Sequence, residues 1–118
     1  MEKVTSVEEA EELLLEIQEK IRKNGLLFLR DKEKNAQTLA RLGLMASHAK
    51  RIIEGLTATD YVSGPEPDIL YPEKFVAVFG IEINGIELYI KFSVGPDGIP
   101  VVCLSFHEAA WPMSYQFK

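Results

Sequence analysis

Apolar residues recur every three or four positions in the first part of the chain and every second position in the last part. The first repeat predicts an amphipathic helix, and the second predicts β-strands with one buried face. Ser6-Val7-Glu8-Glu9 is typical of a capping box at the start of the helix, and Asn24-Gly25 is typical of its end. The inward-facing positions of this helix are Ala10, Leu13, Leu14, Ile17 and Ile21.

The middle of the chain gives shorter and weaker patterns. Residues 26–29 form an apolar run that predicts a short strand, and residues 35–42 and 47–55 carry helical spacing. Residues 57–74 contain one glycine and three prolines and predict an irregular connector.

The strongest local signal is Asn84-Gly85 between two alternating segments, residues 75–83 and 86–94. This dipeptide favours a two-residue hairpin turn. Such a turn pairs Ile83 with Ile86, Ile81 with Leu88, Phe79 with Ile90 and Ala77 with Phe92. These side chains share one face, which we expect to be core, so Tyr89 and Lys91 point the other way.

A third strand is predicted over residues 101–106, with Val102, Leu104 and Phe106 as its core side chains. This choice requires an odd-numbered loop, for instance residues 95–99, and it pairs Leu104 with Ile90. Ser105 then lies opposite Tyr89, and His107 shares its face. An even-numbered loop would break this cluster.

Together these elements predict a single α+β domain over residues 1–118, with residues 1–24 as an acidic N-terminal helix. The expected sheet has three to four antiparallel strands, with the helices packed on one face. At 47% hydrophobic residues the composition is that of an ordinary globular domain. The single cysteine, Cys103, lies in an apolar run and predicts a core residue in a reducing, cytoplasmic protein. We expect no membrane span.

The formal net charge of −5 argues against a simple nucleic-acid binder. Residues 1–19 hold seven acids and one base, whereas residues 20–118 hold eleven acids and twelve bases. The acidic helix is either a solvent-facing surface or a docking face for a basic partner.

The cluster of Tyr89, Lys91, Ser105 and His107 suits metal-independent RNA cleavage. That reaction needs a base for the ribose 2′-hydroxyl, an acid for the leaving 5′-oxygen and positive charge near the phosphate. His107 is the candidate acid or base, Lys91 the phosphate contact and Tyr89 the group that orients the 2′-hydroxyl or stacks on a base. The alternative is a structural histidine at a strand end, beside an exposed cross-strand face. The sequence shows no metal-ligand spacing, and we expect no metal or cofactor.

Several segments resemble the MqsR family, the motility quorum-sensing regulator toxins of type II toxin–antitoxin systems. The resemblance covers the chain from about Gly25 onward. It rests on the order of Leu42-Gly43-Leu44, residues 52–61, Glu87-Leu88-Tyr89-Ile90-Lys91-Phe92 and Leu104-Ser105-Phe106-His107. The run Lys34-Asn35-Ala36-Gln37-Thr38-Leu39-Ala40 and the tail residues Pro112, Met113 and Tyr115 add to it.

The resemblance implies a RelE-like toxin endoribonuclease that cleaves mRNA and is neutralised by a cognate antitoxin, with the ribosome as a further candidate partner. The family's active-site tyrosine matches Tyr89, and its strand-end basic residue, often lysine, matches His107. Ser63 and Val76 stand where the best-known branch has a lysine and a glutamine.

Charge indicates which residues replace those missing polar groups. These are Arg30, Lys34, Gln37 and Arg41, and Tyr115 of the tail completes the candidate substrate-binding residues. The first rival function is a non-catalytic domain that docks an antitoxin or the ribosome. The second is a ligand-binding α+β module unrelated to RNA.

Overall fold

The computed structural model describes residues 3–29 and 32–118 and has the α+β architecture that the sequence predicts. Its elements are α1 (Val7–Asn24), β1 (Leu26–Phe28), α2 (Glu33–Leu42), α3 (Ala46–Glu54), the 3-10 turn η1 (Ala58–Asp60), β2 (Tyr61–Pro67), β3 (Phe75–Ile83), β4 (Ile86–Val94) and β5 (Val101–Glu108). The sheet order is β1-β5-β4-β3-β2, with β1 parallel to β5 and the other neighbours antiparallel. The prediction of three to four antiparallel strands is therefore wrong: the sheet has five strands and is mixed.

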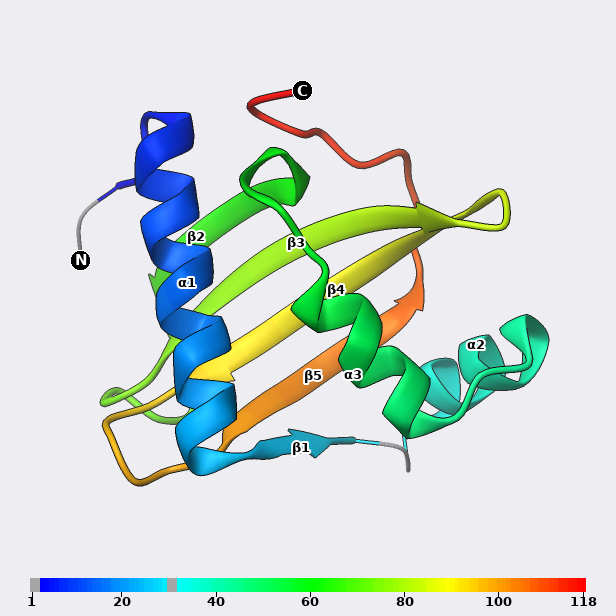
Figure 1. Ribbon diagram of the computed structural model, residues 1–118, viewed down its shortest axis with the longest axis horizontal. Coiled ribbons are helices and arrows are strands. Elements are labelled where there is room, and N and C mark those ends of the chain that lie inside the picture. The colour runs from blue at the N-terminus through cyan, green and yellow to red at the C-terminus, as the bar shows by residue number, and fades with distance from the viewer. Residues whose placement is uncertain (1–2, 30–31) are drawn as a thin grey trace.

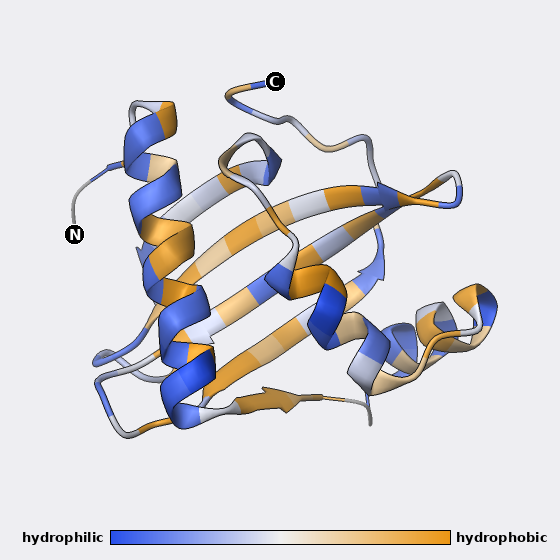
Figure 2. Ribbon diagram, in the orientation of Figure 1, coloured by the Kyte–Doolittle hydropathy of each residue, from blue (hydrophilic) through white to orange (hydrophobic). Residues whose placement is uncertain are grey.

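Helices α1 and α3 cover one face of the sheet, which we term the helix-covered face (Figure 1). Ser6 caps α1 by accepting a hydrogen bond from the Glu9 backbone N–H at 3.2 Å, as the capping box predicts. The five predicted inward positions of α1 are all buried. Orange hydrophobic segments interrupt the blue surface of α1 in Figure 2, as expected of an amphipathic helix.

The hairpin of β3 and β4 confirms the predicted register at all four pairs. Asn84 and Gly85 have φ values of 52° and 80°, as a type I′ turn requires. Phe79, Ile90 and Phe92 are completely buried between the sheet and the helices. The opposite side, the open face, carries Tyr89 and Lys91.

Strand β2 lies in the segment that the sequence predicts to be irregular, so that prediction is wrong over Tyr61–Pro67. Its ladder with β3 shifts register twice, between Tyr61 and Ser63 and between Ser63 and Glu66. These irregularities accommodate a glycine and two prolines within the strand, and prolines are tolerated at sheet edges and bulges. Such an interrupted edge strand is also a poor template for pairing with another chain.

Strand β5 contains a register shift that changes which residues face the core. Ser93 pairs with Val102, but Lys91 pairs with Ser105, so one extra residue of β5 is accommodated between them. Val101, Cys103 and Phe106 are completely buried, whereas Val102 and Leu104 are only half-buried. The predicted core residues Val102 and Leu104, and the pairing of Leu104 with Ile90, are therefore wrong.

The side chain of Asn35, from α2, holds this bulge in place. Its amide nitrogen donates to the Leu104 carbonyl at 3.2 Å and to the Leu29 carbonyl at 2.9 Å, and its oxygen accepts from the Phe106 N–H at 2.9 Å. Thr38 accepts from the Glu108 N–H at 3.1 Å. Helix α2 therefore lies along the outer edge of β5 beyond the end of β1, and its side chains satisfy backbone groups that lack a strand partner there.

Candidate functional site

Tyr89 and His107 lie directly opposite each other on β4 and β5, and Lys91 lies opposite Ser105. The four residues therefore share the open face, as the sequence predicts, but the predicted pairing of Ser105 with Tyr89 is wrong. The route to this arrangement differs from the predicted one, because the loop between β4 and β5 has six residues (95–100) rather than five. The bulge in β5 compensates for this even number and returns His107 to the face of Tyr89.

The rings of Tyr89 and His107 are stacked, with centroids 5.4 Å apart and planes inclined by 15°. This offset parallel arrangement is favourable for aromatic rings and fixes the orientation of the imidazole. Burial of the Tyr89 ring raises the pKa of its phenol, and the negative charge of Glu66 adds to the effect. The phenol therefore keeps its proton across the neutral pH range and is able to donate a hydrogen bond to a ligand.

His107 has one ring nitrogen occupied and one available. Its Nδ1 lies 3.0 Å from the backbone carbonyl oxygen of Glu108. A carbonyl only accepts hydrogen bonds, so Nδ1 carries the hydrogen in this contact. The neutral imidazole then presents an unprotonated Nε2, which is the form that a general base requires.

Beside His107 is a hollow of about 330 Å³, the basic depression, between α2 and the end of β5. It is lined by Lys34, Gln37, Thr38, Arg41, His107, Glu108, Ala109 and Ala110. Three of the five predicted substrate-binding residues, Lys34, Gln37 and Arg41, thus come together next to His107. The two cations give the depression a lining suited to an anion.

Two acidic residues contact the predicted substrate-binding groups. Arg41 Nη1 donates to the carboxylate of Glu108, forming an ion pair that is well exposed on both sides. Gln37 Nε2 donates to Glu33 Oε1 at 3.1 Å. An anionic ligand entering the basic depression therefore competes with Glu108 for Arg41.

A second hollow, the tail pocket, of about 360 Å³, lies between the open face and the C-terminal tail (residues 109–118). It is lined by Val62, Ser63, Val78, Tyr89, His107, Ala109, Ala110, Trp111, Pro112, Met113 and Ser114. Its lining is mostly apolar and aromatic. The tail pocket and the basic depression share His107, Ala109 and Ala110, so the two hollows adjoin.

Glu87 anchors the tail that forms the outer wall of this pocket. Its two carboxylate oxygens accept from the Met113 N–H at 2.8 Å and from the Tyr115 hydroxyl at 3.0 Å. Gly80 leaves the space that Tyr115 fills, since an added Cβ would lie 2.7 Å from the Tyr115 hydroxyl. Burial and the neighbouring Glu87 raise the pKa of Tyr115. Tyr115, a predicted substrate contact, lines neither hollow and holds the tail instead.

The remaining predicted site residues either line neither hollow or lie outside the described residues. Lys91 lies on the open face, two positions along β4 from Tyr89, and lines neither the basic depression nor the tail pocket. Arg30 lies outside the described residues. Glu87, Glu108 and Trp111 were missed as site residues. The only sequence signal for Glu108 and Trp111 is that they follow His107 closely in the chain.

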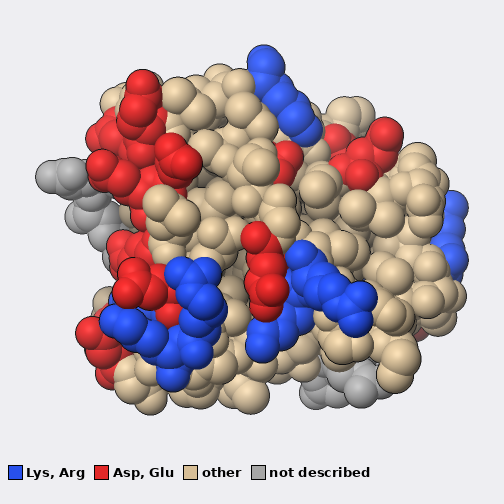
Figure 3. Space-filling model, in the orientation of Figure 1, with Lys and Arg blue, Asp and Glu red and all other residues tan. Residues whose placement is uncertain are grey.

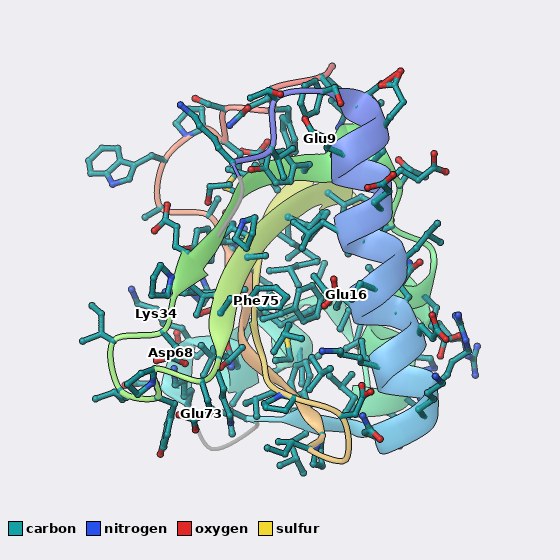
Figure 4. The ribbon with its side chains drawn as sticks, turned by 90° about the vertical axis from the view of Figure 1, so that its left-hand side faces the viewer. Glu9, Glu16, Lys34, Asp68, Glu73 and Phe75 are labelled. Carbon is teal, nitrogen blue, oxygen red and sulfur yellow. The ribbon has the colours of Figure 1, made fainter. Side chains whose placement is uncertain are left out.

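The acidic charge of α1 lies away from this site. Figure 3 shows acidic side chains gathered over α1 on the helix-covered face, with basic side chains at its lower end. In the side view of Figure 4, Glu9 and Glu16 of α1 lie on one side of the sheet, and Lys34 and Asp68 lie on the other. The negative net charge therefore does not describe the local charge around His107.

Three further findings bear on other kinds of chemistry. Burial raises the pKa of the Cys103 thiol to about 12, which makes it a poor nucleophile. Within the described chain, no three His, Cys, Asp or Glu side chains come together in a way that would hold a metal ion. Of the helices in residues 3–29 and 32–118, none is long and apolar enough to cross a membrane.

No protein-family model, curated protein or solved structure matches the chain. The resemblance to MqsR toxins therefore stays a prediction, and the function rests on the geometry of the site.

Proposed function

We propose that the protein is the toxin endoribonuclease of a toxin–antitoxin system and cleaves mRNA by acid–base chemistry that needs no metal. The observation that carries the proposal is the His107 imidazole, which is stacked on Tyr89 with its Nε2 available, at the rim of the basic depression. A base beside cationic side chains is what cleavage at a ribose phosphate requires.

In the proposed reaction, His107 Nε2 accepts the proton of a ribose 2′-hydroxyl. The 2′-oxygen then bonds to the adjacent phosphorus while the bond from phosphorus to the 5′-oxygen breaks. Lys34 and Arg41 hold the phosphate and offset its growing negative charge. The Tyr89 phenol, kept protonated by its raised pKa, donates a proton to the departing 5′-oxygen. The products are a cyclic 2′,3′-phosphate and a 5′-hydroxyl end.

The test measures cleavage of single-stranded RNA by the purified protein in the presence of EDTA, with product ends mapped. We expect cyclic phosphate ends and a rate loss of about 10²- to 10⁴-fold in His107→Ala, the range for loss of a general base. His48→Ala is the matched control, because the second histidine caps α3, where its Nδ1 accepts from the Met45 N–H at 3.0 Å. Equal rates for His107→Ala and the wild type would reject His107 as the base.

Tyr89 needs two variants, because it has two proposed roles. Tyr89→Phe keeps the stacked ring and removes only the phenol, whereas Tyr89→Ala removes both. A large rate loss in Tyr89→Phe assigns the proton donation to the phenol. A loss of cleavage rate in Tyr89→Ala but not in Tyr89→Phe would show that the ring only positions His107.

A non-catalytic binding domain is the second candidate function. The loop between β2 and β3 exposes Ile69 (96%) and Leu70 (79%), and exposed apolar side chains in a group are typical of protein contact surfaces. Such a domain would bind an antitoxin or the ribosome. Growth arrest after induced expression, without new RNA 5′ ends and unchanged in His107→Ala, would favour this candidate over the endoribonuclease.

A further inference from the structure

We propose that the tail pocket binds one unstacked nucleobase of single-stranded RNA, next to the phosphate that is cleaved. The inference rests on the proposed function, because it assigns the substrate contacts on the second side of His107. The ligand class is a nucleotide whose base is turned out of any helix, and the tail pocket is the binding site for that base.

The chemistry of the lining is the first argument. Val62 and Val78 provide apolar surface, and the rings of Tyr89, His107 and Trp111 provide flat faces on which a base stacks. Ser63 and Ser114 also line the pocket, and a serine hydroxyl can form hydrogen bonds with the polar edge of a base. The volume of about 360 Å³ lies in the range of small-molecule sites, about 300–1,000 Å³.

The exposure of Trp111 is the second argument. This indole is 81% exposed although it borders a mostly apolar hollow. A large aromatic side chain left in water is free to close over a flat ligand, and burial of its faces would then contribute to binding.

The adjoining hollows are the third argument. A nucleotide joins a flat, largely apolar base to an anionic phosphate. The tail pocket and the basic depression offer the matching pair of surfaces, and His107 belongs to both. A base in one and its phosphate in the other would bring the ribose between them to the imidazole.

The wall of the tail pocket is formed before any ligand binds. Glu87 fixes Met113 and Tyr115, and Gln116 Nε2 donates to the Val62 carbonyl at 3.1 Å. A preorganised wall lowers the ordering cost of binding. Because the wall and the sheet enclose the base on two sides, a base paired within a duplex would not fit.

Trp111 is the only tryptophan of the chain, so its fluorescence reports on this pocket alone. The wild type is titrated with a 2′-O-methyl RNA hexamer, which lacks the attacking hydroxyl and is not cleaved. We expect saturable quenching by the hexamer and none by an abasic sugar–phosphate chain of the same length. Variants without Trp111 have no tryptophan signal, so their binding is measured by the fluorescence anisotropy of a fluorescein-labelled hexamer, with the wild type as reference. In this assay Trp111→Ala should weaken hexamer binding by about 5- to 150-fold, the factor that stacking on one aromatic ring supplies.

Two further variants separate stacking from general effects. Trp111→Phe retains an aromatic face and should recover most of the affinity. Leu27→Ala removes another exposed apolar side chain, from β1 (55% exposed), and should leave binding unchanged. Equal binding of the normal and abasic hexamers, or equal quenching by a duplex of the same sequence, would overturn the inference.

The outcomes also distinguish this inference from the proposed function. Cleavage of RNA by the wild type, without base-dependent quenching of Trp111, would overturn the nucleobase pocket and leave the endoribonuclease standing. Base-dependent quenching without cleavage of unmodified RNA would overturn the endoribonuclease and support a nucleobase-binding site.

Discussion

The two faces of the sheet are made by alternate residues of the same strands, yet they have different properties. On the helix-covered face, Phe79, Phe92 and Phe106 are completely buried. On the open face, Tyr89, Lys91 and His107 are half-buried and polar, and the C-terminal tail rather than a helix packs over Gly80. Stability thus comes mainly from one face, which leaves the other available for binding and catalysis. Substitutions on the two faces should therefore affect different measurements.

The largest expected contrast is between Phe79→Ala and Tyr89→Ala. Removing the buried Phe79 ring should lower the free energy of unfolding by about 3–5 kcal/mol, because a cavity remains in the core. Removing the half-buried Tyr89 ring should cost about 1–2 kcal/mol. Urea denaturation measures both values, and equal losses would contradict the division of roles between the faces.

Asn35→Ala should have the next largest effect, because it removes the side chain that holds the bulge in β5. The Leu104 carbonyl and the Phe106 N–H would lose their partners, at about 1–3 kcal/mol for each buried group left unpaired. Hydrogen exchange at the Phe106 amide should accelerate. Gln37→Ala, at an exposed position of the same helix, should change stability by no more than about 0.5 kcal/mol. Unchanged exchange at Phe106 in Asn35→Ala would show that the bulge forms without the amide.

Tyr115→Phe should have a smaller effect that depends on pH. Loss of the hydrogen bond to Glu87 should lower the free energy of unfolding by about 1 kcal/mol near neutral pH. Folding raises the pKa of Tyr115, so the neutral phenol is favoured in the folded state. Its contribution is full below the unfolded pKa of about 10 and is lost as pH rises above that value.

Urea denaturation from neutral to alkaline pH checks this dependence. The stability difference between the wild type and Tyr115→Phe should shrink as the pH rises. Tyr71→Phe removes an exposed phenol and serves as the control. A difference that does not change with pH would show that the phenol does not titrate with folding.

Glu108→Gln should have the smallest effect on stability, less than about 1 kcal/mol, because the pair with Arg41 is exposed. Its effect on RNA binding should be larger, since Arg41 is then available to phosphate. The slope of log affinity against log salt should steepen by about 0.7, the value for one added phosphate contact on single strands. Glu11→Gln changes the net charge equally on α1. Equal changes in both variants would indicate a general charge effect rather than a role for Glu108.

The elements that the sequence predicts well are those with strong local signals. The Asn84-Gly85 turn fixes the register of β3 and β4 within two residues, so four cross-strand pairs follow from it. The capping residues Ser6 and Gly25 similarly fix the ends of α1. These features depend on residues that are neighbours in the chain.

The features that the sequence does not predict depend on distant residues. The bulge in β5 is held by Asn35, about seventy positions earlier, and nothing in residues 101–106 indicates it. Strand β2 forms because its backbone pairs with the free edge of β3, despite the poor strand propensity of Gly64-Pro65-Glu66-Pro67. In the site, alternation correctly places Tyr89, Lys91, Ser105 and His107 together. The roles of Glu87 and Trp111 depend on where the tail turns, which periodicity does not report.

The parallel pairing of β1 with β5 has a consequence for the order of folding. Leu26 pairs with Val101, so the two strands are separated by 75 positions in the chain. Contacts between such distant segments form late, because a long loop must close first. Helix α1 and the hairpin of β3 and β4 depend on residues that are close together in the chain, so they can form before β5 joins the sheet. His107 can meet Tyr89 and the α2 side chains only after β5 has joined the sheet, so the site is assembled after the elements that depend on local contacts.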